Sequence, residues 1–152
     1  MQSTHFSIRR LASGDAAFAE QLNDIFGEAF EDQPTYQSNR PALDYLERLL
    51  SKEELLVIVG LVEGQLVGGL VAYEFAKLES ARREIYIYDL AVRGAYRRQG
   101  IASALIAKLK KIASSRGAWV IFVQADYSDE PAIQLYRKIG TQEEVLNFDI
   151  KV

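Results

Sequence analysis

The segment 97–103, RRQGIAS, places two positive charges and a glycine directly before small and apolar residues that favour a helix. Backbone N–H groups in the first turn of a helix have no partner within it, and the helix dipole attracts anions to that end. Glycine lets the backbone approach a ligand closely, and arginine donates hydrogen bonds to phosphate oxygens. The pattern predicts a site for the diphosphate of a cofactor, formed by Arg97, Arg98, Gln99, Gly100, Ile101, Ala102 and Ser103.

The alternative for this segment is a solvated arginine turn that only caps a helix. The segment follows neither GxxxxGK[ST] nor GxGxxG, so a nucleotide-triphosphate loop and a dinucleotide fingerprint are both disfavoured. The 152 residues include no cysteine, which excludes disulfides, cysteine nucleophiles and thiolate metal sites. His5 is the only histidine, which argues against a histidine-based triad or a zinc site, and we expect no metal.

The composition is that of an ordinary globular protein, with 49% hydrophobic and 26% charged residues. Its 18 basic and 21 acidic side chains give a net charge of −3, so broad attraction to nucleic acid is not expected. The N-terminal sequence lacks the apolar run of a signal peptide, and no stretch is long enough to span a bilayer. We therefore expect a single domain over residues 1–152, in the cytoplasm and without membrane partners.

A mixed α/β layer is predicted to position the 97–103 segment. Alternating or β-branched residues predict strands, and apolar residues at helical spacing predict helices, for example Leu43, Leu46, Leu49 and Leu50. Asp129 is predicted to cap a helix that contains Pro131 and ends at Gly140. The predicted strands are 5–11, 55–62, 65–76, 84–92, 118–125 and 143–152; the predicted helices are 15–30, 42–51, 100–116 and 129–140; and 31–41 is a predicted loop.

The chain resembles the GNAT superfamily of acyl-CoA N-acyltransferases. The superfamily pattern Arg/Gln-x-x-Gly-x-Gly/Ala matches RRQGIA after the strand IYIYDLAV, and LYRKIG follows later in the chain. The elements GAWVIFVQADY and EEVLNFDI make the chain similar to one branch, the type I aminoglycoside 3-N-acetyltransferases that modify gentamicin. The likeness covers most of the chain from about Asp24 onward.

This resemblance implies the GNAT fold, a mixed central sheet flanked by helices in which strands 84–92 and 118–125 splay apart. It implies acetyl-coenzyme A as the donor, with the pantetheine arm inserted between the two strands. Backbone groups of Leu90, Ala91 and Val92 would contact the arm, and the amides of 98–102 would hold the pyrophosphate. Asp129 and Thr141 depart from the superfamily, in which Asn and Phe are common, and this weakens the case for cofactor contacts from the 129–140 helix.

The resemblance also places Tyr136 in LYRKIG where a phenol faces the thioester sulfur. We expect Tyr136 to act as general acid, or at least as hydrogen-bond donor, to the leaving sulfur; the alternative is a tyrosine that only packs in the core. The amide of Val92 or of a neighbour is the expected oxyanion donor.

The general base is open at this stage. An amine like that of lysine has a pKa of about 10.4, so it must lose a proton before it attacks. Several superfamily members use a glutamate where this chain has Tyr86. Asp126 and Asp149 are the candidates for the base, with Glu144 as a third, and each could instead bind a cationic acceptor.

The acceptor implied by the branch is an aminoglycoside, whose several ammonium groups call for carboxylates in a partly desolvated cleft. Tyr36 and Tyr127 are further candidates for sugar contacts, whereas Glu28, Asp32 and Glu79 are expected on the solvated surface. The residues expected to bind the acceptor are Tyr86, Tyr88, Asp126, Glu143, Glu144 and Asp149.

The leading hypothesis is therefore an enzyme that transfers acetyl directly, in a ternary complex, to the 3-amine of an aminoglycoside. A second hypothesis is acetylation of a polyamine, an amino sugar or a protein amine, and a third is an acyl-CoA sensor without catalysis. The predicted last strand could pair across a homodimer, which we expect because GNAT domains often dimerise.

Overall fold

A five-stranded sheet forms the centre of the computed structural model, which describes residues 4–152 apart from the side chains of Gln37 and Ser38. The strands follow one another in chain order across the sheet, antiparallel from β1 to β4 and parallel between β4 and β5. They are β1 (Ser7–Arg10), β2 (Leu55–Val62), β3 (Gln65–Ala76), β4 (Arg83–Val92) and β5 (Ala118–Val123).

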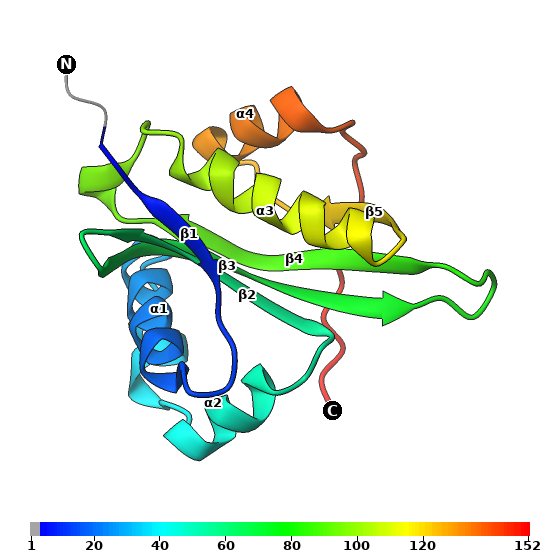
Figure 1. The fold of residues 1–152 in the computed structure, drawn as a ribbon. Helices are drawn as coiled ribbons and strands as arrows, with labels where there is room; N and C mark the ends of the chain where they lie inside the picture. Colours follow the sequence, from blue (N-terminus) through cyan, green and yellow to red (C-terminus); the bar gives the residue numbers. More distant parts are fainter. Residues whose placement is uncertain (1–3) are drawn as a thin grey trace.

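Helices cover both faces of this sheet (Figure 1). One face carries α1 (Ala16–Ala29) and α2 (Leu43–Leu50), and the other carries α3 (Ile101–Ser115) and α4 (Glu130–Ile139). A π-helical turn, η1 (Pro34–Ser38), lies within the predicted loop, and a 3₁₀ turn, η2 (Gly94–Tyr96), precedes α3. The predicted α/β class, with a mixed central sheet flanked by helices, and the predicted positions of the four helices and of the first five strands are confirmed.

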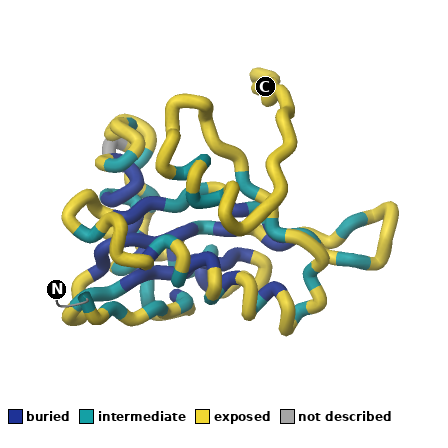
Figure 2. The backbone as a smooth tube through the Cα atoms, turned by 90° about the horizontal axis from the view of Figure 1, so that it is seen from above, coloured by how far each residue is buried: buried dark blue, intermediate teal, exposed yellow. Residues whose placement is uncertain are grey.

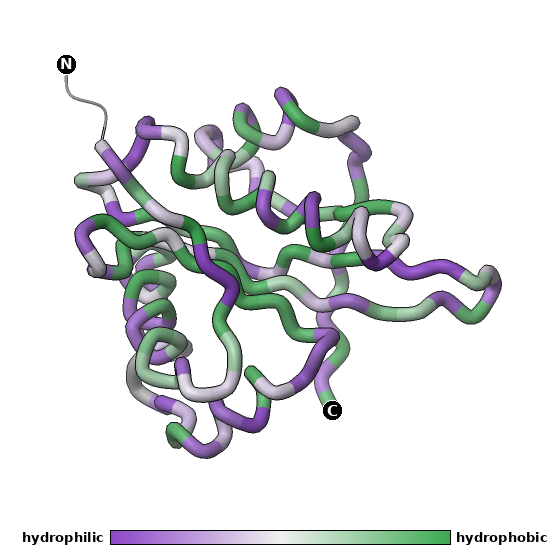
Figure 3. Tube along the Cα trace, in the orientation of Figure 1, coloured by the Kyte–Doolittle hydropathy of each residue, from purple (hydrophilic) through white to green (hydrophobic). Residues whose placement is uncertain are grey.

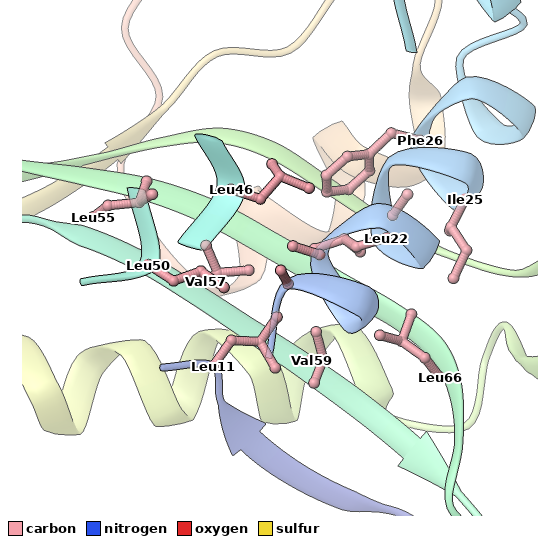
Figure 4. Packing of buried hydrophobic residues seen from close by; sticks show 13 residues of the cluster. Leu11, Leu22, Ile25, Phe26, Leu46, Leu50, Leu55, Val57, Val59 and Leu66 are labelled. Carbon is pink, nitrogen blue, oxygen red and sulfur yellow. The ribbon is translucent and has the colours of Figure 1, made fainter. Parts of the chain in front are cut away.

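The core consists of two hydrophobic clusters, one on each face of the sheet. In the first cluster, Leu22 and Phe26 of α1 pack with Val57 and Val59 of β2 (Figure 4). The intervening Ile58 of β2 belongs to the second cluster, beneath α3. Because β2 is covered on both faces, its sequence is a continuous apolar run. The hydropathy trace accordingly shows hydrophobic colour along the central strands (Figure 3).

Glycine at position 69 lets α1 pack directly on the sheet. A Cβ built there would lie 2.7 Å from Leu22 Cδ1 and 2.8 Å from the carbonyl oxygen of Ile58. Both distances are too short, so a larger residue would push α1 away from β3.

The predicted strand at 143–152 is wrong for the isolated chain. Residues 141–152 form no strand or helix and are exposed throughout. Figure 2 shows this C-terminal segment as an exposed stretch that extends away from the rest of the chain. Its alternating pattern predicts a strand, but a strand also has to pair with the edge of another strand, and the sheet of the described residues comprises β1 to β5 without this segment.

Candidate acyl-transfer site

The two strands predicted to splay do separate, at the middle of β4. The parallel ladder between them ends at the pairs Tyr86 with Phe122 and Ile87 with Val123. The segment 90–92 of β4 pairs with β3 on one side, at Gly68 to Leu70, and with no described strand on the other. This side of the segment is therefore an open strand edge, and such an edge can pair with an extended ligand.

A β-bulge lies in β4 at the point of separation. Ile87 pairs with Ala72 and Asp89 pairs with Val71, so Tyr88 is an extra residue in β4. Bulges re-aim the side chains beside them. Here the bulge brings the Asp89 side chain to the α1 side of the sheet, where it meets Tyr36 of η1.

Asp89 is a functional candidate that the sequence analysis missed. The Tyr36 hydroxyl lies 3.1 and 3.2 Å from the two carboxylate oxygens of Asp89. Burial raises the pKa of the Asp89 carboxyl, and the hydrogen bond from Tyr36 lowers it by a smaller amount. Burial and the nearby Asp89 carboxylate in turn raise the pKa of Tyr36. A half-buried carboxylate with a raised pKa beside an open strand edge is suited to accept a proton.

An aromatic group lines the same face of the sheet beside Asp89. Tyr88 makes edge contacts with Tyr73 and Tyr86, at ring separations of 6.1 and 5.8 Å. Tyr86 stacks on Phe122 at 4.9 Å, and its hydroxyl donates to Gln124 Oε1 at 2.8 Å. Tyr86 thereby joins β4 to the chain just beyond β5, where the two strands begin to separate.

The 97–103 segment forms a tight turn into α3, as predicted. Arg98 and Gly100 both have left-handed backbone conformations, with φ of 61° and 85°, and no side chain caps the helix. Arg97 Nε donates to the carbonyl oxygen of Val92 at 3.2 Å, which ties the turn to the end of β4. Consecutive N–H groups in such a conformation form a concave anion site. The Ile101 side chain is buried beneath α3, so only its backbone is available to a ligand.

Tyr136 lies on α4, partly buried against the cluster beneath α3. Burial, together with the nearby Asp129 carboxylate, raises the pKa of Tyr136 to about 12. Its phenol therefore stays protonated across the physiological range and can act as a hydrogen-bond donor. Asp129 Oδ1 accepts from the N–H of Ala132 at 3.3 Å, which confirms the predicted cap of this helix.

The structure does not bring every predicted acceptor residue to this site. Asp126 lies exposed in the loop after β5, whereas Glu143, Glu144 and Asp149 lie in the exposed C-terminal segment. Glu79 pairs with Lys77 at 3.0 Å in the β3–β4 connection, in line with its predicted surface position.

Within residues 4–152, no three His, Cys, Asp or Glu side chains are grouped so that they could hold a metal ion. No helix in this range is long and apolar enough to cross a bilayer.

Comparison with known proteins places this geometry in a family. The family model described as Acetyltransferase (GNAT) family matches residues 19–141. The chain belongs to the GNAT acetyltransferase family. The matched GNAT region runs from α1 to just past α4 and therefore includes the split strands, the 97–103 turn and Tyr136.

Two solved structures of aminoglycoside acetyltransferases are similar to this GNAT protein along most of its length. An aminoglycoside acetyltransferase from an uncultured soil metagenomic sample is 53% identical, with a TM-score of 0.95, over 97% of this chain and 99% of its own. A second aminoglycoside acetyltransferase from such a sample, in complex with sisomicin, is 33% identical, with a TM-score of 0.90. The match covers 97% of this chain and 96% of that protein's chain.

Curated sequences are more distant from this GNAT chain. The thialysine N-epsilon-acetyltransferase of Bos taurus is 31% identical over 90 residues, which are 59% of this chain and 53% of that protein. The chain thus spans about half the length of this relative. The aligned curated relatives include more than one kind of N-acetyltransferase.

Proposed function

We propose that the protein transfers the acetyl group of acetyl-coenzyme A to the 3-amino group of aminoglycosides such as gentamicin. The observation that carries the proposal is the likeness along 97% of the chain to an aminoglycoside acetyltransferase at 53% identity. A second similar protein, also an aminoglycoside acetyltransferase, is known in complex with sisomicin. The choice of the 3-amine rests on the elements QADY and NFDI in the sequence, which resemble those of the type I aminoglycoside 3-N-acetyltransferases.

The residues present fit coenzyme A. The left-handed Arg98 and Gly100 turn the backbone N–H groups of 98–103 into a concave site for the pyrophosphate. The open edge at Leu90 to Val92 would pair with the amides of the pantetheine arm. When bound, the thioester supplies an activated acetyl group.

Tyr136 serves as the proton donor to the leaving sulfur. Its pKa of about 12 keeps the hydroxyl protonated at neutral pH. A thiol of this kind has a pKa of about 8.5, so its departure needs only modest help, and one well-placed phenol is sufficient. The Val92 amide, on the segment of β4 that has no partner beyond β3, would stabilise the developing oxyanion.

Asp89 is the general base in this proposal. Its raised pKa makes it a stronger proton acceptor than an exposed aspartate, and Tyr36 fixes its orientation. Asp126 and Asp149 remain predictions for the same role. Both are exposed in the single chain, where a carboxylate is better suited to bind an ammonium group than to remove a proton in a desolvated site.

The acceptor lies on the aromatic face beside Asp89. Tyr86 and Tyr88 offer rings and hydroxyls to the sugars, and an ammonium group above a tyrosine ring is attracted to it. The remaining predicted contacts are charge pairs with the ammonium groups, from Asp126, Glu143, Glu144 and Asp149.

The test is release of free coenzyme A thiol with a panel of amines, followed by NMR of the product. We expect turnover with gentamicin and sisomicin and a single acetyl group on the 3-amine. An acetyl on another amine would contradict the regiospecificity, and binding of acetyl-coenzyme A without turnover on any amine would contradict an enzymatic role.

A second candidate acceptor is a cationic amine other than an aminoglycoside. The 31% identity to a thialysine N-epsilon-acetyltransferase favours including thialysine, and polyamines as a further class, in the panel. A kcat/KM for one of these amines well above that for every aminoglycoside would support this candidate over the first.

A further inference from the structure

An open cavity of about 220 Å³ lies at the opposite end of α3 from the 97–103 turn. Its walls are the β3–β4 hairpin, at residues 76–77 and 81–83, and the turn at 116–117 that joins α3 to β5. Figure 1 shows the hairpin extending past the sheet at the end where α3 finishes. The 15 residues of α3 span about 22 Å, so this cavity is separate from the proposed cofactor site.

The charged side chains that line this cavity are all basic. They are Lys77, Arg82, Arg83 and Arg116, and none of the described lining residues is acidic. Lys77 and Arg82 come from the turn of the hairpin, Arg83 begins β4, and Arg116 follows α3. The positive charges therefore lie on more than one wall of the cavity.

Carboxylates beside the cavity neutralise only part of this charge. Two glutamates pair with Lys77, at 3.0 and 3.2 Å. Glu74, a buried carboxylate of β3, pairs with both Arg83 and Arg116. Four basic side chains thus meet three carboxylates, and the excess lies on the arginines, since three guanidinium groups share the single carboxylate of Glu74.

A neighbouring arginine shows the effect of this excess. Arg10 and Arg116 both donate to the carbonyl oxygen of Glu53, at 3.4 and 2.8 Å. Burial and the charge of Arg116 lower the pKa of Arg10. The side chains of Arg10 and Glu53 have opposite charges, so this pair does not remove the excess. A bound anion would reduce the repulsion among the arginines.

Arg82 is the arginine of this group that makes no ion pair with a carboxylate of residues 4–152. Its guanidinium carbon lies 3.3 Å from the ring centre of Trp119, and this stack fixes the orientation of the group. Stacking uses the face of a guanidinium and leaves its N–H groups, which lie in its plane, for acceptors. Arg82 Nε is buried and has no hydrogen-bond partner within the described chain, so the protein alone does not satisfy this guanidinium.

We propose that this cavity binds a phosphate group, either inorganic phosphate or the phosphate of a small ester. Arginine binds phosphate through two parallel hydrogen bonds, and a tetrahedral phosphate accepts from several directions, which suits donors on different walls. The cavity is smaller than the about 300–1,000 Å³ of sites for drug-sized ligands, and this favours an ion or a small ester. The site lies apart from the acyl-transfer site and does not depend on the proposed function.

Fluorescence of Trp119 tests the proposal, because this is the only tryptophan in the chain and Arg82 stacks on it. We expect a saturable change on addition of phosphate at constant ionic strength, with a Kd of about 1–10 mM. Glycerol 3-phosphate is titrated in parallel. Tighter binding of the ester would identify an ester as the ligand, and tighter binding of phosphate would identify the free ion. No saturation with either up to about 100 mM would overturn the proposal.

Variants of the lining residues locate the bound phosphate. Arg83→Gln removes a donor whose side chain is 58% exposed and keeps the stack of Arg82 on Trp119, and we expect the Kd to rise about tenfold. Lys77→Gln should also weaken binding, and it leaves the buried ion pairs of Glu74 intact if Arg83→Gln does not fold. Arg48→Gln on α2, with a side chain 67% exposed, is the control. An unchanged Kd in both cavity variants would overturn the proposal.

The 97–103 turn is a second place where phosphate can bind. Arg98→Ala removes a charge there and should leave the Trp119 response unchanged, because α3 separates the two places by about 22 Å. A response lost in Arg98→Ala and retained in Arg83→Gln would place the phosphate at the turn and overturn the proposal. A protein that acetylates no amine should still show the response at Trp119, so the two proposals fail independently.

Thermal unfolding gives a readout that does not depend on fluorescence. A ligand that binds only the folded state raises the Tm, and phosphate at ten times its Kd should raise it by about 3–6 °C. Phosphate also stabilises proteins in general through exclusion from their surface. Arg83→Gln separates the two effects, since it should show a smaller rise than the wild type. An equal rise in both proteins would indicate the general effect only and would contradict a site at this cavity.

Discussion

Asp89 and Tyr136 are both partly buried, and burial moves each toward its neutral form. For Asp89 the result is a carboxyl that holds a proton more readily than an exposed aspartate. For Tyr136 the result is a phenol that keeps its proton up to about pH 12. Two groups with such different affinities for a proton can act as base and acid in one reaction.

Replacing Tyr136 with phenylalanine tests the acid. We expect kcat to fall about 100-fold while KM for acetyl-coenzyme A changes little, because the hydroxyl acts mainly on the leaving sulfur. Steady-state kinetics with gentamicin measure both constants. Tyr45→Phe on α2 is the control, and equal kcat values for wild type and Tyr136→Phe would remove the role.

Replacing Asp89 with asparagine tests the base. We expect kcat to fall about 100-fold and the loss of activity at acid pH to disappear from the profile, because no carboxyl remains to be protonated. Asp44→Asn, an exposed aspartate on α2, is the control and should keep the wild-type profile. If Asp89→Asn still lost activity at acid pH like the wild type, and Asp126→Asn or Asp149→Asn did not, the base would be Asp126 or Asp149.

Tyr36→Phe gives an independent test of the same pair. The Tyr36 hydrogen bond lowers the pKa of Asp89, so its removal should raise that pKa further. The base would then be protonated at a higher pH, so the fall of kcat/KM on the acid side of the pH profile should move to higher pH. If the acid-side fall of kcat/KM stayed at the same pH or moved to lower pH, the result would contradict the role of Asp89.

At the scale of elements, the proposed cofactor site is the first turn of α3, and the geometry of this turn depends on Gly100. Residues with side chains adopt a φ of 85° at a cost of about 1–2 kcal/mol. The far end of α3 offers a matched position, since Gly117 has a φ of 69°, and a Cβ at either glycine would meet nothing within 4 Å.

Replacing each glycine with alanine distinguishes an effect on coenzyme A binding from an effect on the free energy of unfolding. Both Gly100→Ala and Gly117→Ala should lower the free energy of unfolding by about 1 kcal/mol. Only Gly100→Ala should weaken coenzyme A binding, by about tenfold if the strain is relieved by a shift of the turn. Calorimetry measures the Kd, and equal Kd values for the two variants would contradict a cofactor site at this turn.

The sequence predicts these elements well where the pattern is local. Helical spacing, the Asp129 cap and the RRQG turn depend on neighbouring residues, and all are found. Asp89 was missed because its position depends on a bulge that shows only in the pairing of β3 with β4. The 143–152 strand was predicted from alternation alone, and alternation does not specify whether the segment meets a strand edge with which it can pair.

At the scale of the whole molecule, a buried carboxylate joins the far end of α3 to the sheet. Glu74 of β3 binds Arg83 of β4 and Arg116 at the end of α3, the latter at 2.7 Å, and its side chain is only 2% exposed. Burial alone would raise the pKa of Glu74, but hydrogen bonds from Arg116 and Arg83 outweigh it and lower the pKa below its usual 4.5.

Glu74→Gln should destabilise the protein at neutral pH by about 3 kcal/mol, because it leaves two arginines beside an uncharged buried group. A lowered carboxyl pKa contributes stability that is present above the unfolded-state value, near 4.5, and is lost as pH falls through the folded-state value. The difference between wild type and variant should therefore shrink below about pH 4.5. Urea unfolding at several pH values measures it, with Asp44→Asn as control, and a difference independent of pH would contradict the assignment.

A crystal structure with coenzyme A and sisomicin tests the account of the site most directly. It should show the pyrophosphate on the N–H groups of 98–103, the pantetheine arm along Leu90 to Val92, and the sulfur facing the Tyr136 hydroxyl. Coenzyme A bound elsewhere, with the 98–103 turn empty and the edge of β4 unpaired, would contradict the account.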